Sequence, residues 1–412
     1  MTPRAPARHA AVAFILVTLA IDALGFGIVI PILPELVRTL SGLTRSGAAF
    51  AMGLSVALFA VAQLFAAPLL GGLSDRFGRR PVILLSVTGI AANYVLLAWA
   101  PSLPWIYLGR LLAGATAANV STATAYIADI SPPDQRARRF GLIGATFSFG
   151  FVIGPAVGGY LGAIDLRLPF MVSAVLAGCN ALYGLLVLPE SLAPEHRQPF
   201  TWKGANPVAA LHLLTRDAVL KRLALAWACM WFGIGAIQTV FVLSTGLRFG
   251  WGPHQNGEAL ALVGISGALV QTFLVRRATT RFGERGAAMV GQGASVIAYL
   301  GLAFAPVPWM IYPAIMVNAI GQLANPAVRS LISARAGPDN QGHVMGGLSV
   351  VEGMTAIVSP LIASVLFSQF AGPNAIFQFP GVPFMVASAA FVVAIFAVHV
   401  GPARQVRTRP AE

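Results

Sequence analysis

The chain has 412 residues, of which 57% are hydrophobic and only 10% are charged. So few charges cannot solvate so much apolar surface in water, so the composition excludes a soluble protein and predicts one embedded in lipid. The formal net charge of +13 is divided among short clusters between long apolar runs. This distribution argues against a nucleic-acid partner, which would require Lys and Arg gathered on one face with aromatic residues.

The first apolar run, residues 10–33, follows Arg4 and Arg8 as the core of a signal peptide would. It is longer than a signal core, lacks a small-residue cleavage site and is followed by many similar runs, so we expect a retained helix. Twelve runs are long enough to cross about 30 Å of hydrocarbon as helices. They are residues 10–33, 46–70, 82–100, 105–129, 140–163, 168–188, 220–245, 256–275, 286–304, 308–331, 342–369 and 382–400.

The basic residues predict how these helices are oriented. Most of the 27 Lys and Arg residues fall at the two ends of the chain, in alternate loops and in the polar segment 189–218. Because basic loops remain in the cytoplasm, both termini and this segment are predicted to be cytoplasmic. We expect a six-helix bundle in residues 1–188, a linker in residues 189–218 and a second bundle in residues 219–412.

The two predicted bundles share sequence features at a constant spacing. Arg76-Phe77-Gly78-Arg79-Arg80 is followed 205 residues later by Arg281-Phe282-Gly283-Glu284-Arg285, and Pro155 is followed at the same spacing by Pro360. Several matches at one spacing indicate a duplicated six-helix unit. The predicted fold is therefore an all-α polytopic membrane protein, and repeats of this kind place a substrate cavity between the halves near the midplane.

Asp22, Arg110 and Glu352 are ionisable residues that fall within predicted membrane helices, away from their ends. A charge at the centre of such a helix costs on the order of 2.5 to 3.5 kcal/mol on insertion scales, so it should face a cavity or a partner. A buried carboxylate could bind and release a proton as the cavity faces each side in turn. Alternatively, the acids are hydrogen-bonded between packed helices and Arg110 is a fixed structural charge.

Other polar and small residues in the helices are candidates for function. Asn93, Gln271 and Asn318 could line a substrate cavity or simply bridge helices. The fifth predicted helix carries a small-residue face that allows close helix approach, with a proline that kinks it. This face contains Gly154, Pro155, Gly158 and Gly159. It suits a rocking contact between halves, although helix packing alone would explain it.

No residue pattern indicates an enzyme. Cys179 and Cys229 both lie within apolar runs and are expected to be small packing residues without a disulfide. The His and Cys residues lack metal-ligand spacing, and no Ser-His-Asp set is evident. The sequence therefore predicts no catalytic residue, no cofactor and no metal.

Several of these motifs resemble the major facilitator superfamily, and within it the bacterial drug/proton antiporters of the tetracycline-efflux family. The resemblance is nearly full length and is strongest over residues 15–190. The residues that carry it are the loop Gly71–Arg80, Arg110 with Gly114 and Ala118, the glycine motif around Pro155, Asp22–Pro31 and Ala125–Ile130. Asp22–Pro31 is similar to the first-helix signature of the tetracycline exporters.

The resemblance implies roles for individual residues. Asp75, Arg79 and Asp129 would form a cytoplasmic charge relay that latches one conformation. Asp22 and Arg110 would take part in proton coupling. The fifth-helix glycines would form the antiporter motif of the family.

Three positions depart from the family pattern. Asn93 and Ser295 stand where the family has aspartates, and Gly267 stands where it has a histidine. In the family these groups serve the metal-chelated drug and proton coupling. Glu352 has no counterpart in the family pattern, so we expect it to replace the lost carboxylate.

The sequence therefore predicts a proton-coupled antiporter that exports an amphipathic, tetracycline-like drug across the bacterial inner membrane by alternating access. Its partners would be the drug, protons and the lipid bilayer, and we expect it to act as a monomer. One alternative is a transporter of another drug or of a metabolite such as a sugar or organic acid. A different class of alternative is a membrane-embedded sensor, which would bind a ligand without transporting it.

Overall fold

The computed structural model describes residues 5–117, 119–199, 211, 214–215, 217–337, 340–372, 375 and 377–399. Ala118, much of the predicted linker 189–218 and the residues from 400 onward lie outside this part. Every long element in the described residues is a helix, as the composition predicts.

The helices follow one another with short connections. The α-helices are α1 (Ala5–Val29), α2 (Leu33–Ser41), α3 (Arg45–Phe77), α4 (Arg79–Ala98), α5 (Leu103–Ala115), α6 (Asn119–Ile130), α7 (Pro133–Ile164), α8 (Leu168–Val187), α10 (Ala218–Phe249), α11 (Pro253–Leu269), α12 (Val275–Phe304), α13 (Ile311–Gly321), α14 (Ala324–Ala336), α15 (Gln341–Ala371) and α16 (Val382–His399). Three short turns of other helix types are η1 (Pro194–His196), η2 (Val270–Leu274) and η3 (Pro308–Met310).

Local chemistry sets several helix ends. Thr44 caps the start of α3 and Asp217 caps the start of α10, and each side chain accepts a backbone N–H. Asp217 also pairs with Arg335 at the end of α14. Gly42 and Gly250 end α2 and α10 in the left-handed conformation, with φ of 66° and 69°, which favours glycine.

Two predicted membrane helices are broken in the structure. Residues 105–129 form α5 and α6, which are interrupted at Thr116, and its hydroxyl bonds back to the Leu112 carbonyl oxygen at 2.9 Å. Residues 308–331 form η3, α13 and α14, with the last break just before Pro326, which has no N–H to continue the helical bonding.

In another part of the chain, two helices that were predicted to be separate form one helical stretch. The predicted helices 256–275 and 286–304 lie in one helical stretch, Pro253–Phe304, which turns at Gly283. In the described residues, nine helical stretches are long and apolar enough to cross a membrane, rather than the twelve predicted. The two broken helices and the one merged stretch account for the difference.

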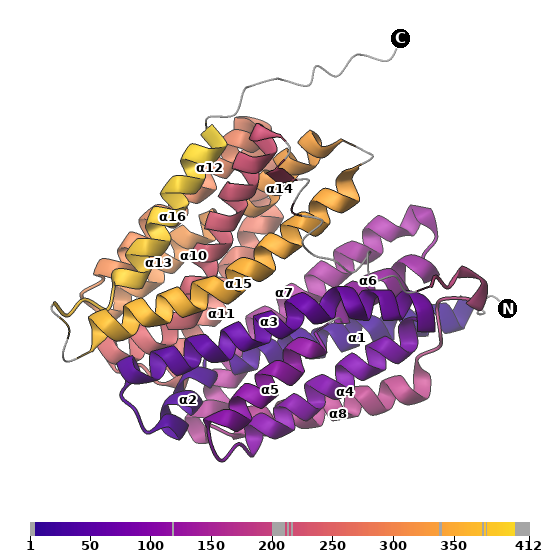
Figure 1. The fold of residues 1–412 in the computed structure, drawn as a ribbon, viewed down its shortest axis with the longest axis horizontal. Helices are drawn as coiled ribbons and strands as arrows, with labels where there is room; N and C mark the ends of the chain where they lie inside the picture. Colours follow the sequence, from indigo (N-terminus) through magenta and orange to yellow (C-terminus); the bar gives the residue numbers. More distant parts are fainter. Residues whose placement is uncertain are drawn as a thin grey trace, which may run out of the picture.

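The helices form two groups that meet at one end and splay apart at the other (Figure 1). The helices up to α8 pack mainly on each other, as do those from α10 onward. Two antiparallel pairs join the groups, namely α3 with α15 and α7 with α11. At the open end, α7 is exposed at residues such as Phe140 and Phe149.

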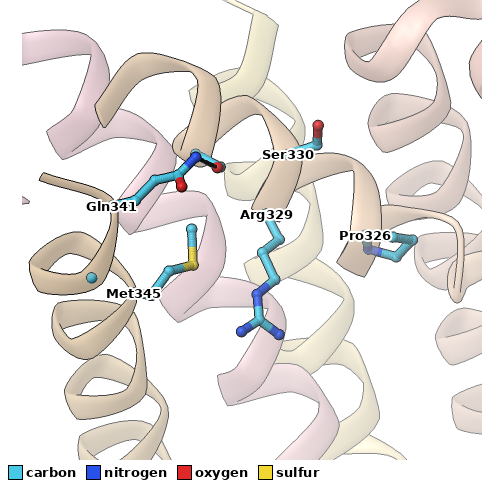
Figure 2. Close-up of a pocket in the computed structure, with 7 residues that line it drawn as sticks. Pro326, Arg329, Ser330, Gln341 and Met345 are labelled. Carbon is cyan, nitrogen blue, oxygen red and sulfur yellow. Dashed lines mark hydrogen bonds between the residues drawn. The ribbon is translucent and has the colours of Figure 1, made fainter. Parts of the chain in front are cut away.

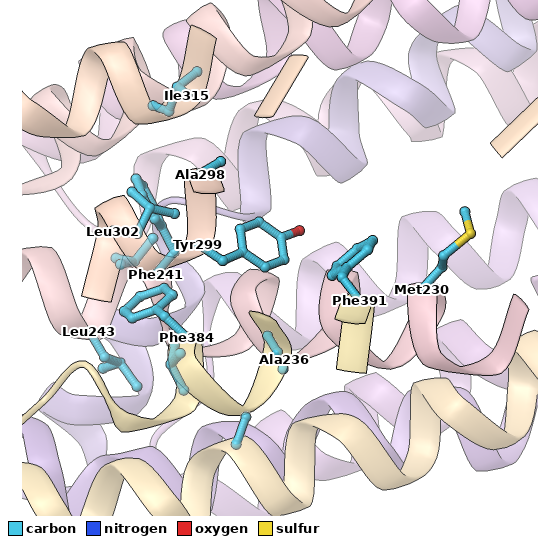
Figure 3. Close-up of a cluster of buried hydrophobic side chains, with 14 of the residues drawn as sticks. Met230, Ala236, Phe241, Leu243, Ala298, Tyr299, Leu302, Ile315, Phe384 and Phe391 are labelled. Carbon is cyan, nitrogen blue, oxygen red and sulfur yellow. The ribbon is translucent and has the colours of Figure 1, made fainter. Parts of the chain in front are cut away.

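The interior of the second group is packed with apolar side chains from α10, α12 and α16 (Figure 3). Tyr299 and Phe391 meet edge to face at a ring-centroid distance of 5.2 Å. Phe384 and Phe241 fill the neighbouring space, and all four side chains are almost fully buried. Such close packing, rather than exclusion of water, holds helices together in lipid.

Arginines cap two corresponding helix ends on the side where the groups meet. Arg167 donates to the Ala100 carbonyl oxygen at 2.9 Å, just beyond α4. Arg248 donates to the carbonyl oxygen of Ala305, just beyond α12. A cation is favourable at a helix C-terminus because the last carbonyl groups have no partner within the helix.

Candidate functional site

The predicted small-residue face of α7 packs against α1. A Cβ atom on Gly154 would lie 2.7 Å from the Cα atom of Gly27, and one on Gly158 would collide with the Ile28 carbonyl oxygen. Pro155 lies against Gly27 in the same contact. Glycine is therefore required here because the two backbones are in contact.

The neighbouring position, Gly159, faces the other group of helices. A Cβ atom on Gly159 would lie 2.6 Å from the Pro253 carbonyl oxygen and 2.9 Å from the Cα atom of Gly257. Further along the same pair of helices, a Cβ atom on Gly264 would lie 2.8 Å from the side chain of Val152. The glycine motif thus makes two contacts, one within the first group and one between groups.

A second close contact joins α3 to α15. A Cβ atom on Gly53 would lie 2.7 Å from the Pro360 carbonyl oxygen, and one on Gly353 would lie 2.8 Å from the side chain of Leu64. Sequence reasoning missed Gly53, Gly257 and Gly353 as contact residues. The signal was available for Gly257, since Gly257 and Gly264 are spaced by two helical turns on α11.

The three residues of the predicted charge relay come together. The Arg79 Nη1 atom lies 2.5 Å from Asp75 Oδ1, and Arg79 Nε lies 3.1 Å from Asp129 Oδ2. Ser74 and Ser191 bond to the same cluster, at 3.0 Å and 3.1 Å. Because α3, α4 and α6 all belong to the first group, the cluster ties that group together at its open end.

Glu190, which sequence reasoning missed, contacts the start of α4 next to this cluster. Its carboxylate accepts the backbone N–H groups of Arg79 at 2.8 Å and Arg80 at 3.2 Å, at the start of α4. A carboxylate is favoured at a helix N-terminus. Gly78 precedes the helix at φ 108°, and any Cβ atom there would collide with the Glu190 carboxylate. A lone acid after a predicted helix gives no signal of this contact.

We expect Glu190→Ala to lower the thermal unfolding midpoint of the detergent-purified protein by about 1 to 2 °C. Loss of a helix-capping side chain typically costs about 1 kcal/mol. Glu190→Gln should lower it less, because the amide oxygen still accepts one N–H. Glu195→Ala serves as the control, since Glu195 is exposed in η1. An equal midpoint for Glu190→Ala and the wild-type protein would contradict the capping role.

Asp22 and Arg110 both lie within electrostatic range of one tyrosine, Tyr94. The Tyr94 hydroxyl packs on Gly25, one turn from Asp22 along α1, and it interacts electrostatically with both Asp22 and Arg110. Arg110 is 8% exposed and its guanidinium lies 4.5 Å from the centre of the Phe59 ring. The Arg110 Nε–H has no acceptor among the described residues. A buried guanidinium with an unpaired N–H is uncommon in a folded protein, which is why Arg110 stays a candidate functional residue beside its alternative as a fixed structural charge.

Glu352 lies in the second group, on α15. Its Oε1 atom accepts a hydrogen bond from Trp227 Nε1 at 3.1 Å, and Arg329 of α14 interacts with it electrostatically. The Trp227 ring lies 6.1 Å from that of Trp231, one turn further along α10. The second group of helices therefore contains a hydrogen-bonded carboxylate, Glu352, and the first group contains the carboxylate of Asp22.

The predicted cavity residues lie on three different elements. Asn93 is buried on α4 and lies against Gly109, Gln271 is exposed in η2, and Asn318 is half-buried in α13. Within the described residues, no hydrogen bond joins any of these three to another predicted site residue. Ser295, a departure from the family pattern, packs on Gly321 of α13, near Asn318.

An open cavity of about 570 Å³ lies between α14 and α15 (Figure 2). Arg329 extends from α14, and Gln341 and Met345 line the opposite side from α15. Ser330, also on the wall, donates a hydrogen bond to Glu284. The cavity therefore has a lining of mixed character that includes a guanidinium.

A second cavity, of about 370 Å³, lies between α1 and α7 and has apolar walls. It is lined by Leu16, Val17, Ala20, Ala145, Thr146 and Phe149. Over the described part of the chain, no group of three or more His, Cys, Asp or Glu residues is placed to hold a metal ion.

The sequence also matches a family of known proteins. The model of the Major Facilitator Superfamily matches residues 15–275 and 240–412. The chain belongs to the major facilitator superfamily. Proteins of this superfamily are membrane transporters rather than enzymes, so the chain is a multi-pass membrane transporter of small molecules.

Curated relatives confirm the resemblance to the tetracycline exporters. The chain is 37% identical to the class C tetracycline resistance protein of Escherichia coli, over 94% of this chain and 96% of the relative. It is 34% identical to the class B protein of Escherichia coli, over 86% of this chain and 88% of the relative. A Bacillus subtilis multidrug resistance protein is 28% identical over 84% of this chain and 85% of the relative.

Solved transporter structures share the fold. A human organic anion transporter matches with a TM-score of 0.70 and 25% identity, covering 95% of this chain and 99% of its own. A bacterial homologue of the lysosomal transporter Spinster, in an inward-facing state, matches with a TM-score of 0.73 and 18% identity, covering 96% of each chain.

Proposed function

We propose that this protein exports an amphipathic, tetracycline-like drug across the bacterial inner membrane in exchange for protons. The observation that carries the proposal is the electrostatic interaction of Tyr94 with both Asp22 and Arg110, in the interior of a transporter whose relatives are tetracycline resistance proteins. A carboxylate in an apolar interior can take up a proton from one side and release it to the other.

We propose twelve membrane crossings in two six-helix bundles, residues 1–188 and 219–412, joined by the linker 189–218. In this arrangement α5 with α6, and α13 with α14, each form one interrupted crossing. Backbone geometry supports the duplication. Gly78 and Gly283, 205 residues apart, have positive φ values of 108° and 67°. The break at Thr116 likewise corresponds, within a residue or two, to the break at Gln322.

We place both termini in the cytoplasm, on the basis of the basic loops. The open end of the molecule, where α1 begins, is then cytoplasmic, and the closed contacts of α3 with α15 and α7 with α11 lie on the outer side. The structure corresponds to an inward-facing state under this orientation. The fold match to an inward-facing transporter agrees with it.

In the proposed cycle, Asp22, Arg110 and Glu352 carry the coupling to protons. The charge relay of Asp75, Arg79 and Asp129 links helices of the first bundle at its cytoplasmic end. The relay would contact the second bundle when the cytoplasmic end closes. The glycines of α7 allow the bundles to rock, because backbone contacts have no long side chains to disengage.

We propose an amphipathic substrate because the two cavities differ in the polarity of their lining residues. The cavity between α1 and α7 is apolar, whereas that between α14 and α15 carries Arg329. Asn93, Ser295 and Gly267 replace the acids and the histidine that serve a metal-chelated drug in the family. We therefore propose that the drug does not have to be bound as a metal chelate.

Everted membrane vesicles test this proposal. Vesicles with an acidic interior should accumulate tetracycline or another drug from a resistance panel, and a protonophore should abolish the accumulation. Adding a metal chelator should leave the accumulation unchanged. Drug accumulation that persists with a protonophore would eliminate proton coupling, and binding without accumulation would favour a sensor.

One observation favours a second candidate, transport of an organic anion. The cavity lined by Arg329 offers a guanidinium to a negatively charged group, and a solved organic anion transporter shares the fold. Accumulation of a fluorescent organic anion, but of no neutral or cationic drug, in the same vesicles would decide for this candidate.

A further inference from the structure

A single tryptophan holds the carboxylate of the second bundle. Trp227 is 1% exposed, and its Nε1–H donates to Glu352 Oε1 at 3.1 Å across the contact between α10 and α15. An indole N–H only donates, so it can pair with an ionised carboxylate and binds a protonated carboxyl less well. The strength of this contact therefore depends on whether Glu352 carries a proton.

The other charged group that faces Glu352 comes from α14. Arg329 interacts electrostatically with Glu352 and projects into the open cavity. The carboxylate thus interacts with a buried neutral donor and with an exposed cation. The cation is accessible from the cavity, whereas the donor is fixed in the packed interior.

The residue after Glu352 lies at the contact between the bundles. Gly353 packs against the side chain of Leu64 of α3, and a Cβ atom there would lie 2.8 Å from a Leu64 methyl group. A shift of α15 that follows release of Glu352 from Trp227 would therefore act directly on the α3–α15 contact. In this way a proton on one carboxylate can bias the angle between the bundles.

We infer that Trp227 is the positioning residue for Glu352, holding the ionised carboxylate against α10 and releasing it when a proton binds. This inference rests on the proposed role of Glu352 in proton coupling and names the group that controls it. Trp227 is buried from solvent, so in this proposal it acts through Glu352.

The test is Trp227→Phe, which keeps an aromatic ring but removes the N–H donor. The ionised carboxylate loses its hydrogen bond, so Glu352 should hold a proton at lower proton concentration. We expect the pH profile of drug transport in everted vesicles to move about one unit toward alkaline pH, a tenfold change in proton affinity. The matched control is Trp231→Phe, because Trp231 Nε1 has no hydrogen-bond partner among the described residues.

A measurement without transport separates this inference from the proposed function. Tryptophan emission of the purified wild-type protein should contain a pH-dependent component that is absent in Glu352→Gln and in Trp227→Phe but present in Trp231→Phe. A wild-type pH profile in Trp227→Phe, with that emission component retained, would overturn the inference while leaving drug export intact. A normal pH profile of transport in Glu352→Gln would show that Glu352 does not couple transport to protons. The emission titration would still decide whether Trp227 responds to the charge of Glu352.

Discussion

Asp22→Asn is expected to reduce proton-driven drug accumulation in everted vesicles to the level of membranes without the transporter. Asparagine has the size of aspartate but cannot take up a proton, so the exchange loses the group that carries it. The amount of protein in the membrane should stay at the wild-type level, since the substitution removes a charge from an apolar interior. Exchange of labelled for unlabelled drug at equal concentrations, without a pH gradient, should persist.

Asp165→Asn provides the matched control, because Asp165 is exposed after the end of α7. It should leave accumulation unchanged. Accumulation by the Asp22→Asn protein that responds normally to the pH gradient would show that Asp22 is only a packing residue. Loss of both accumulation and drug exchange would instead indicate a role in drug binding.

Gly159→Val is expected to block export by holding the outer side of the protein open. The new Cβ atom would lie 2.6 Å from the Pro253 carbonyl oxygen, and backbone cannot move aside as a side chain could. Overpacking of this kind costs about 1 to 3 kcal/mol, which corresponds to roughly a 5- to 150-fold change in an equilibrium between two states. The inward-facing state should lose most of its population.

Thiol labelling measures this population. Ser364 is fully buried where α15 meets Gly53 of α3, so Ser364→Cys should be shielded in the closed contact. An impermeant maleimide added from outside should label it faster in the presence of Gly159→Val. Both native cysteines, Cys179 and Cys229, are replaced by alanine beforehand.

Gly178→Val is the control for the effect of added volume in a helix. A Cβ atom on Gly178 would meet nothing within 4 Å. This variant should transport and label as the parent protein does. Normal export by Gly159→Val would mean that the α7–α11 contact does not limit the cycle.

The sequence predicted the helical fold, one ion-paired cluster and one close helix contact. The helical fold follows from long apolar runs, and the proximity of Asp75, Arg79 and Asp129 follows from the family resemblance and agrees with the two ion pairs they form. The glycines of α7 were expected to allow close helix contact, and they do so against both α1 and α11.

The missed features depend on distant or subtle interactions. Glu190 reaches the start of α4 from a segment 110 residues away, which no local pattern reveals. An apolar run gives no sign of the break at Thr116, because a hydroxyl that bonds to its own helix barely changes hydrophobicity. Pro326 did give a signal for the second break, since proline lacks the donor that a continuous helix needs.

Arg167 and Arg248 pair with corresponding helix ends in the two groups of helices. Ala100 and Ala305 are 205 residues apart, and each receives an arginine on its carbonyl oxygen. The arginines themselves come from different places, one before α8 and the other at the end of α10. The same unpaired carbonyl group at two corresponding helix ends is therefore paired with arginines from two different parts of the fold. The need of a helix C-terminus for a cation does not specify which helix supplies it.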